Sequence, residues 1–110
     1  MVKQGDIIKI NFNPQSGHEQ AGYRPALVVS NNIINQNTNI AMVCPISNTK
    51  NEFRAFPLHI ALDDRTKTTG SVLCQHIRAL DIKSRGYTFI ESIPDDILKL
   101  VIATIIAEIK

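Results

Sequence analysis

Several features that define other classes of protein are absent from this sequence. Its longest charge-free stretch near the end, Leu100 to Ala107, is far too short to span a bilayer. The opening residues, Met1 to Asp6, lead straight into an alternation of polar and apolar residues and do not resemble a signal peptide. The two cysteines, Cys44 and Cys74, lie in separate apolar runs and cannot build a disulfide framework. We therefore expect a cytoplasmic protein with buried, reduced thiols and no membrane association.

Motifs for metals and nucleotide cofactors are also lacking. The three histidines lack the short spacings that build zinc sites, and four of the aspartates form two adjacent pairs whose members point in different directions on regular structure. These residues are His18, His59, His76, Asp63, Asp64, Asp95 and Asp96. There is no Gly-x-Ser-x-Gly, no P-loop and no dinucleotide fingerprint. The sequence therefore predicts no cofactor and no metal.

The composition indicates one globular domain spanning residues 1–110. The hydrophobic fraction is 44% and the charged fraction is 20%, as in ordinary globular proteins. A net charge of +2 neither requires nor excludes a nucleic-acid partner. Between Lys50 and Arg85, basic residues outnumber acidic ones, which indicates either a phosphate-binding side or an ordinary solvated surface.

Most of the chain reads as short strands separated by turns. Apolar runs or apolar alternation predict strands at residues 6–12, 26–30, 40–46, 56–62, 71–80 and 87–90. Ile8, Ile10 and Phe12 should share one face of the first strand, and Pro57 predicts that the fourth lies at a sheet edge. We expect a bend near Gln75 and His76, and a single helical turn capped by Asn31.

The last segment changes to a helical period. Isoleucine, leucine and valine recur about every four residues from Ile97 to Ile109, as on one stripe of a helix. Ser92 and Asp95 match the spacing of a capping box, and Pro94 and Asp96 fit a first turn. Many short strands with one helix predict an α+β fold, a small barrel with a helical lid.

The most informative segment is the polar, glycine-bracketed stretch from Gly17 to Pro25. Pro25 biases Arg24 to extended geometry, so its guanidinium is held at the start of a buried strand. A guanidinium beside a carboxylate and an imidazole suits a phosphate group. Without further information, the residue types favour the simpler alternative, a structural ion pair between Arg24 and Glu19.

The residues Gly17-His18-Glu19-Gln20-Ala21-Gly22-x-Arg24-Pro25, after Gly5-Asp6-Ile7-Ile8, resemble the opening motif of the MazF/PemK toxin ribonucleases. Similar motifs follow in order along nearly the whole chain: Pro45-Ile46-Ser47, Thr69 to Cys74, Ile77 to Asp81, Arg85-Gly86 and Pro94-Asp95. The resemblance implies an SH3-like β-barrel of the CcdB/PemK kind with a C-terminal helix. It also implies a homodimer that cleaves single-stranded RNA and is silenced by a cognate antitoxin.

The resemblance assigns the catalytic residues as well. Arg24 occupies the position of the family's catalytic arginine, and Ser47 that of a threonine hydroxyl. His18 and Glu19 become the candidate base and the residue that orients it, or else RNA contacts. The implied reaction is attack of a ribose 2′-hydroxyl on its own phosphate, without a metal. Some relatives have an arginine and an aspartate with acid/base roles at the positions of Leu73 and Gln75, and this chain lacks both.

Further polar, basic and aromatic residues are candidate RNA contacts. Gln75 could read a base edge through its amide, and His76 could stack, titrate or simply lie at the surface. Phe53 could stack on a base or pack beneath its loop. The full set of RNA-binding candidates is Gln20, Asn48, Lys50, Phe53, Arg54, Lys67, Gln75, His76 and Arg78.

Two other functions fit a fold of this kind. One is a gyrase-inhibiting toxin of the CcdB kind, which would bind a protein and cleave nothing; that class lacks the Glu-Gln-x-Gly-x-Arg-Pro loop. The other is a catalytically inactive SH3-like module that binds nucleic acid or protein, which the departures at Leu73, Gln75 and Ser47 would allow.

Overall fold

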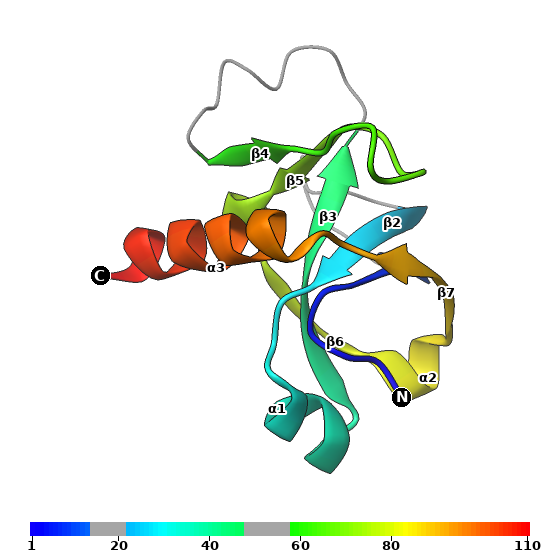
Figure 1. Ribbon diagram of the computed structural model, residues 1–110. Helices are drawn as coiled ribbons and strands as arrows, with labels where there is room; N and C mark the ends of the chain where they lie inside the picture. Colours follow the sequence, from blue (N-terminus) through cyan, green and yellow to red (C-terminus); the bar gives the residue numbers. More distant parts are fainter. Residues whose placement is uncertain (14–21, 48–57) are drawn as a thin grey trace.

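A computed structural model describes residues 1–13, 22–47 and 58–110, which form an antiparallel sheet of seven strands with a long helix across one face (Figure 1). The strands are β1 (Asp6–Asn11), β2 (Tyr23–Val28), β3 (Ile40–Ser47), β4 (His59–Ala61), β5 (Ser71–Leu73), β6 (Arg78–Asp81) and β7 (Tyr87–Ser92). The helices are α1 (Asn32–Asn37), the 3-10 helix η2 (Cys74–His76), α2 (Ile82–Arg85) and α3 (Asp95–Ile109).

The long strand β3 organises the sheet. Its first half pairs with β6 and its last two residues pair with β5, while β2 lies along its other side. The order is β4-β5-β3-β2-β1-β7, with β6 paired to β3 outside this path. Within the described residues no pairing joins β4 to β7, so the barrel is not closed between these two strands. The α+β class and the C-terminal helix are confirmed.

Apolar side chains alternate between two cores on opposite faces of the sheet. Ile8, Ile10 and Phe12 are fully buried in one core, as the alternation in the sequence predicts. Ile7, from the same strand, belongs to the other core, which α3 covers. Strand β2 also contributes to both cores, since Leu27 belongs to one and Ala26 and Val28 to the other.

The connections largely follow the predicted elements. Asn31 caps α1, because its side-chain oxygen accepts a hydrogen bond from the backbone N–H of Ile34 at 3.0 Å. Strand β4 lies at the sheet edge as expected, although it spans only His59–Ala61; residues 56 and 57 lie outside the described part of the chain. The predicted bend at Gln75 and His76 is the 3-10 helix η2.

Helix α2 is not predicted by the sequence pattern. Asp81 caps it by accepting a hydrogen bond from the backbone N–H of Ser84 at 2.9 Å. Gly86 ends it with a φ of 69°, a conformation that favours glycine. A helix of four residues is too short to show a hydrophobic period.

Helix α3 confirms the predicted apolar stripe but begins later than expected. Ile97, Val101 and Ile105 are buried against the sheet. The predicted capping box is wrong, because Ser92 is the last residue of β7 and pairs with Asp6 in β1. The helix starts at Asp95, and Pro94 precedes the first turn as the residue whose carbonyl accepts from the Leu98 N–H.

The two thiols are free and buried, as the sequence predicts. Burial raises the pKa of both, to about 12 for Cys74, so both remain protonated near neutral pH. In the described part of the chain, no helix is long and apolar enough to cross a membrane.

Candidate functional site

Arg24 and Ser47 stand near one end of the sheet, on neighbouring strands. In β2 and β3, Ala26 pairs with Pro45; continuing this register by two residues sets Arg24 opposite Ser47. Paired residues at the same register position project from the same face of a sheet. The two strands therefore bring the two predicted catalytic residues to one face.

The two side chains differ in exposure. Arg24 is exposed and lies opposite Ile10 in the β1–β2 pairing. Ser47 is only 5% exposed and pairs with Ser71 of β5, which is 6% exposed. An exposed guanidinium and a buried hydroxyl on neighbouring strands can both bind one phosphate group, the guanidinium from the solvent side and the hydroxyl from the protein side.

A third functional group in this region was not predicted. His59 of β4 pairs with Leu73 of β5, and its Nε2 lies 2.8 Å from Nε2 of Gln75. The sequence contained a signal for it: if Leu58 and Ile60 face one core, His59 must face the other way. The spacing of the three histidines in the sequence gives no indication of this contact.

Arg78 and Arg85 converge on the end of β1. Arg78 Nη1 donates to the carbonyl of Phe12 at 3.2 Å, and its guanidinium lies 5.5 Å from the centre of the Phe12 ring. Arg85 Nη1 donates to the carbonyls of Asn11 and Asn13 at 2.8 and 2.6 Å. Three consecutive carbonyls are thus held by two arginines immediately before residues 14–21.

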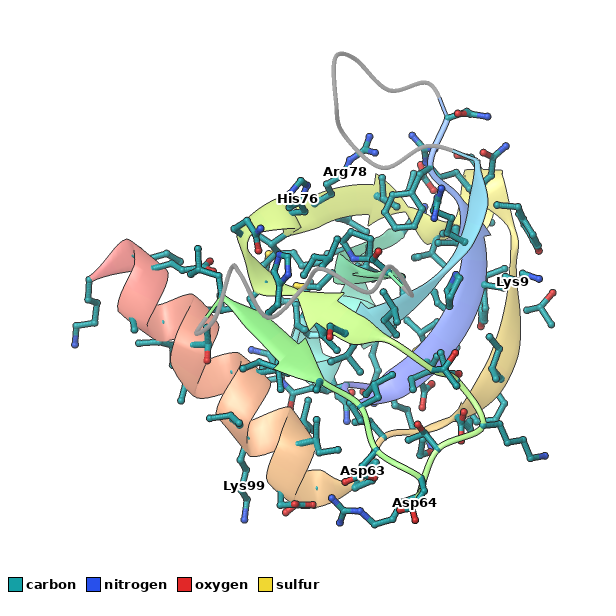
Figure 2. All side chains as sticks on the ribbon, turned by 90° about the horizontal axis from the view of Figure 1, so that it is seen from above. Lys9, Asp63, Asp64, His76, Arg78 and Lys99 are labelled. Carbon is teal, nitrogen blue, oxygen red and sulfur yellow. The ribbon has the colours of Figure 1, made fainter. Side chains whose placement is uncertain are left out.

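His76 and Lys67 lie in different places. Figure 2 shows His76 beside Arg78 at one end of the molecule, with Asp63 and Asp64 at the opposite end. Lys67 is exposed, in the connection between β4 and β5, where its backbone N–H donates to Glu91 Oε1 at 3.1 Å. Of the RNA-binding candidates that the structure describes, Gln75, His76 and Arg78 therefore gather around η2 and β6, whereas Lys67 lies in a loop tied to β7.

Seven predicted site residues lie outside the described part of the chain: His18, Glu19, Gln20, Asn48, Lys50, Phe53 and Arg54. In the sequence, one of their two segments ends shortly before Arg24 and the other begins directly after Ser47. Both segments therefore join the strands that carry the two predicted catalytic residues.

The connection from β4 to β5 is held in place by an acidic side chain of β7. Glu91 of β7 accepts from the backbone N–H groups of Lys67 and Thr68 and from the Thr68 hydroxyl, at 3.1, 2.9 and 2.9 Å. Burial alone would raise the pKa of Glu91, but these hydrogen bonds outweigh it and hold the pKa below its usual value. The loop that leads into Ser71 is therefore fixed by a carboxylate that stays ionised.

Arg65 forms a second, exposed network. Its guanidinium binds Asp63 and Asp96 at 2.8 to 3.1 Å, which ties this loop to the first turn of α3. Hydrogen bonds from Arg65 lower the pKa of both carboxyl groups. Because these carboxylates are engaged with Arg65, they are poorly placed to hold a cation. Among the described residues, no group of three or more histidine, cysteine or acidic side chains could hold a metal ion.

A surface depression of about 250 Å³ lies elsewhere, between α1, β3 and α2. It is lined mainly by apolar groups, including Val2, Ala41 and Ile82. None of the predicted site residues contributes to it, and we assign the candidate site to the Arg24–Ser47 end of the sheet instead.

Comparisons with known proteins agree on one family. Residues 3–109 match the family model described as PemK-like, MazF-like toxin of type II toxin-antitoxin system. The endoribonuclease PemK of Escherichia coli is 33% identical over 102 residues, which cover 92% of this chain and 77% of that protein. The endoribonuclease toxin ChpB of Escherichia coli is 39% identical over 88 residues, covering 76% and 72% of the two chains.

Solved structures give the same result for the fold. MazF from Deinococcus radiodurans superposes with a TM-score of 0.88 at 32% identity, covering 98% of this chain and 96% of that one. A MazE-MazF structure from the same organism gives a TM-score of 0.82 at 32% identity, covering 98% and 95%.

Proposed function

The chain belongs to the PemK-like, MazF-like toxins of type II toxin–antitoxin systems and is an endoribonuclease, and we propose that it cleaves single-stranded cytoplasmic RNA at short sequences without a metal. The observation that carries this proposal is the placement of Arg24 and Ser47 at facing positions of β2 and β3. A positive charge and a hydroxyl on neighbouring strands suit one phosphate group of a bound RNA.

The proposed nucleophile belongs to the substrate. The ribose 2′-hydroxyl attacks the adjacent phosphorus, the bond from phosphorus to the 5′-oxygen breaks, and a 2′,3′-cyclic phosphate and a 5′-hydroxyl are released. The hydroxyl proton leaves to a base, and the 5′-oxygen takes up a proton. The protein must hold the attacking and leaving oxygens in line and stabilise the charge that grows on the phosphate oxygens.

Arg24 supplies that stabilisation in this mechanism. Its guanidinium offers two charged donors to the phosphate oxygens as the phosphorane forms. Guanidinium groups are in general poor proton donors, so we assign Arg24 an electrostatic role. Ser47 donates a hydrogen bond to the same phosphate. His18 and Glu19 are the proposed base and its orienting partner.

Leu73 and Gln75 exclude one version of the mechanism. Leu73 is buried and apolar, and the Gln75 amide does not exchange a proton near neutral pH. Acid/base roles at these two positions therefore do not apply to this chain. We assign Gln75, His76, Arg78 and Lys67 to RNA binding, together with Gln20, Asn48, Lys50, Phe53 and Arg54.

We further propose two protein partners. MazF of Deinococcus radiodurans is found in MazE-MazF complexes, and an endoribonuclease from Mycobacterial species in complex with its cognate antitoxin shares the fold. A cognate antitoxin with an acidic segment would cover the basic groups around Arg24 and exclude RNA. A homodimer is supported by large apolar side chains that α3 leaves exposed: Leu100 at 53%, Ile106 at 51% and Ile109 at 78%.

The activity is tested by incubating the purified protein with a long single-stranded RNA in excess EDTA and mapping the fragment ends. We expect cuts at a recurrent short sequence. Arg24→Ala should lower the rate by about a hundredfold or more, as loss of a charged donor to a transition state does. Lys99→Ala is the matched control, since Lys99 is an exposed cation on α3 that bonds only Asp95 among the described residues.

The controls separate the alternatives. Light scattering and thermal melts should show that Arg24→Ala keeps the fold and the dimer. Absence of cleavage by the folded wild-type protein would contradict the proposal and favour an inactive or protein-binding relative. Equal cleavage by wild type and Arg24→Ala would contradict the role of Arg24.

A further inference from the structure

Two adjacent side chains on the Ser47 face of the sheet form an unusual pair. His59 and Gln75 meet through their nitrogen atoms, with His59 Nε2 and Gln75 Nε2 separated by 2.8 Å. An amide nitrogen can only donate, so His59 Nε2 must be the acceptor. The imidazole then carries a proton on Nδ1.

The other ring nitrogen is enclosed. His59 Nδ1 is buried and has no hydrogen-bond partner among the described residues. The ring is half-buried on the edge strand β4, where it pairs with Leu73 of β5. Packing at the ring and the bond to Gln75 thus hold His59 at both ends, and the histidine has no accessible nitrogen for direct contact with a substrate.

Gln75, in contrast, is exposed in η2. Because its Nε2 is bonded to His59, the amide cannot turn freely, and its carbonyl oxygen Oε1 projects away from the ring. The pairing of Ser47 with Ser71, and of His59 with Leu73 two residues further along β5, places His59 on the same sheet face as Ser47. Gln75 contacts His59 and therefore lies beside this face.

We propose that His59 is a positioning residue for RNA recognition, which fixes the Gln75 amide so that Oε1 accepts a hydrogen bond from the amino group of a base. This inference rests on the proposed endoribonuclease function. An acceptor at this position selects cytosine or adenine, which carry amino groups, over uracil, which has a carbonyl oxygen in the corresponding place. Without His59, the amide would turn and present either of its ends to the base.

The test compares short RNA substrates that contain the cleavage sequence, with cytosine exchanged for uracil at each flanking position in turn. For the wild type we expect one position at which the kcat/KM for the base with an amino group exceeds that for uracil by roughly tenfold, within the range for hydrogen bonds to bases. His59→Leu and Gln75→Leu should each reduce this ratio to about one, and the double variant should add nothing further.

Two further variants make the test specific. In His59→Gln, the new side-chain amide oxygen can accept the hydrogen bond from Gln75 Nε2. This variant should therefore keep much of the wild-type preference for the base with an amino group over uracil. Gln36→Leu removes an exposed amide from α1, at the other end of β3 from Ser47, and should leave the ratio unchanged (Figure 1). Long-range proton–nitrogen correlation spectra should show the His59 proton on Nδ1 in the wild type.

The outcomes are distinct. A proton on Nε2 would overturn the inference, because Gln75 would then present its amino group. Unchanged discrimination in a folded, active His59→Leu variant would overturn it while leaving the proposed function intact, and so would a His59→Gln variant that loses the discrimination as fully as His59→Leu. No cleavage by the wild type would overturn the proposed function and this inference with it.

Discussion

Arg85 Nη1 donates a hydrogen bond to the carbonyl oxygen of Asn13 at 2.6 Å. Asn13 is the last described residue before the segment that contains His18 and Glu19. The same guanidinium nitrogen also binds the carbonyl of Asn11, so α2 and the end of β1 are joined across a large sequence separation. A short helix that the sequence pattern did not predict thereby holds the backbone of Asn11 and Asn13, the last described residues before residues 14–21.

Replacing Arg85 by alanine should reduce RNA cleavage more than it reduces stability. Two hydrogen bonds to backbone carbonyls would be lost, with an expected decrease of about 1 kcal/mol in the free energy of unfolding, since both lie near the surface. Asn13, which precedes the segment with the candidate base in the sequence, would lose its hydrogen bond to Arg85, and kcat should fall by roughly tenfold or more. Urea denaturation and initial cleavage rates measure the two effects.

Lys83→Ala provides the comparison, because Lys83 is an exposed cation in the same helix. Lys83→Ala should change neither the free energy of unfolding nor kcat by a measurable amount. If Arg85→Ala keeps the wild-type kcat, the bond to Asn13 has no role in positioning the loop.

Replacing Glu91 by glutamine should destabilise the protein and reduce its acid sensitivity. Glutamine has one acceptor oxygen in place of two, so at least one of the bonds to Lys67 and Thr68 is lost, at a cost of about 1 kcal/mol. The pKa of Glu91 is lowered in the folded protein, so its contribution to stability is present above the ordinary value of 4.5 and is lost as the pH falls through the folded value. Denaturation at a series of pH values measures both effects.

The wild type should therefore lose more stability than Glu91→Gln between about pH 6 and about pH 3. Parallel losses in the two proteins would show that Glu91 is not a source of acid sensitivity. A stability unchanged at neutral pH would show that its bonds to the loop are energetically negligible.

Replacing Ser47 by threonine should raise kcat by a few fold. The added methyl group restricts χ1, so the hydroxyl would spend more time in the orientation that donates to the phosphate. Ser47→Ala should instead lower kcat, because the hydroxyl is lost. Since Ser47 is only 5% exposed, a thermal melt must accompany the kinetics. A threonine variant with native stability and a reduced kcat would contradict this account of the hydroxyl.

The sequence predicted the parts of the fold that depend on periodic burial. The alternation of Ile8, Ile10 and Phe12 and the stripe from Ile97 to Ile105 each follow from one face meeting a core, and both are confirmed. The helix start was misplaced because Ser92 has the spacing of a cap, yet its backbone is engaged by Asp6 in the sheet. Pairing between distant strands decided that boundary, and local sequence does not reveal it.

The site was predicted only in part for a similar reason. Arg24 and Ser47 were named from a resemblance, and the β2–β3 register sets them at facing positions, although their roles remain predictions. The pair of His59 and Gln75 depends on how β4 aligns with β5, two short strands whose register the sequence does not specify. Arg78 was expected at the RNA, and the structure shows that one of its nitrogens is already bonded to the Phe12 carbonyl.

The central claim, that the substrate's own 2′-hydroxyl is the nucleophile, is tested most directly with an RNA that carries one 2′-deoxynucleotide on the 5′ side of the mapped cut. The digest is run in excess EDTA, and fragment masses are compared with those from the all-ribose RNA. The account predicts a 2′,3′-cyclic phosphate from the ribose substrate and no cleavage at the deoxy position, with other sites still cut. Cleavage at the deoxy position, or ends lacking the cyclic phosphate from the start of the reaction, would contradict it.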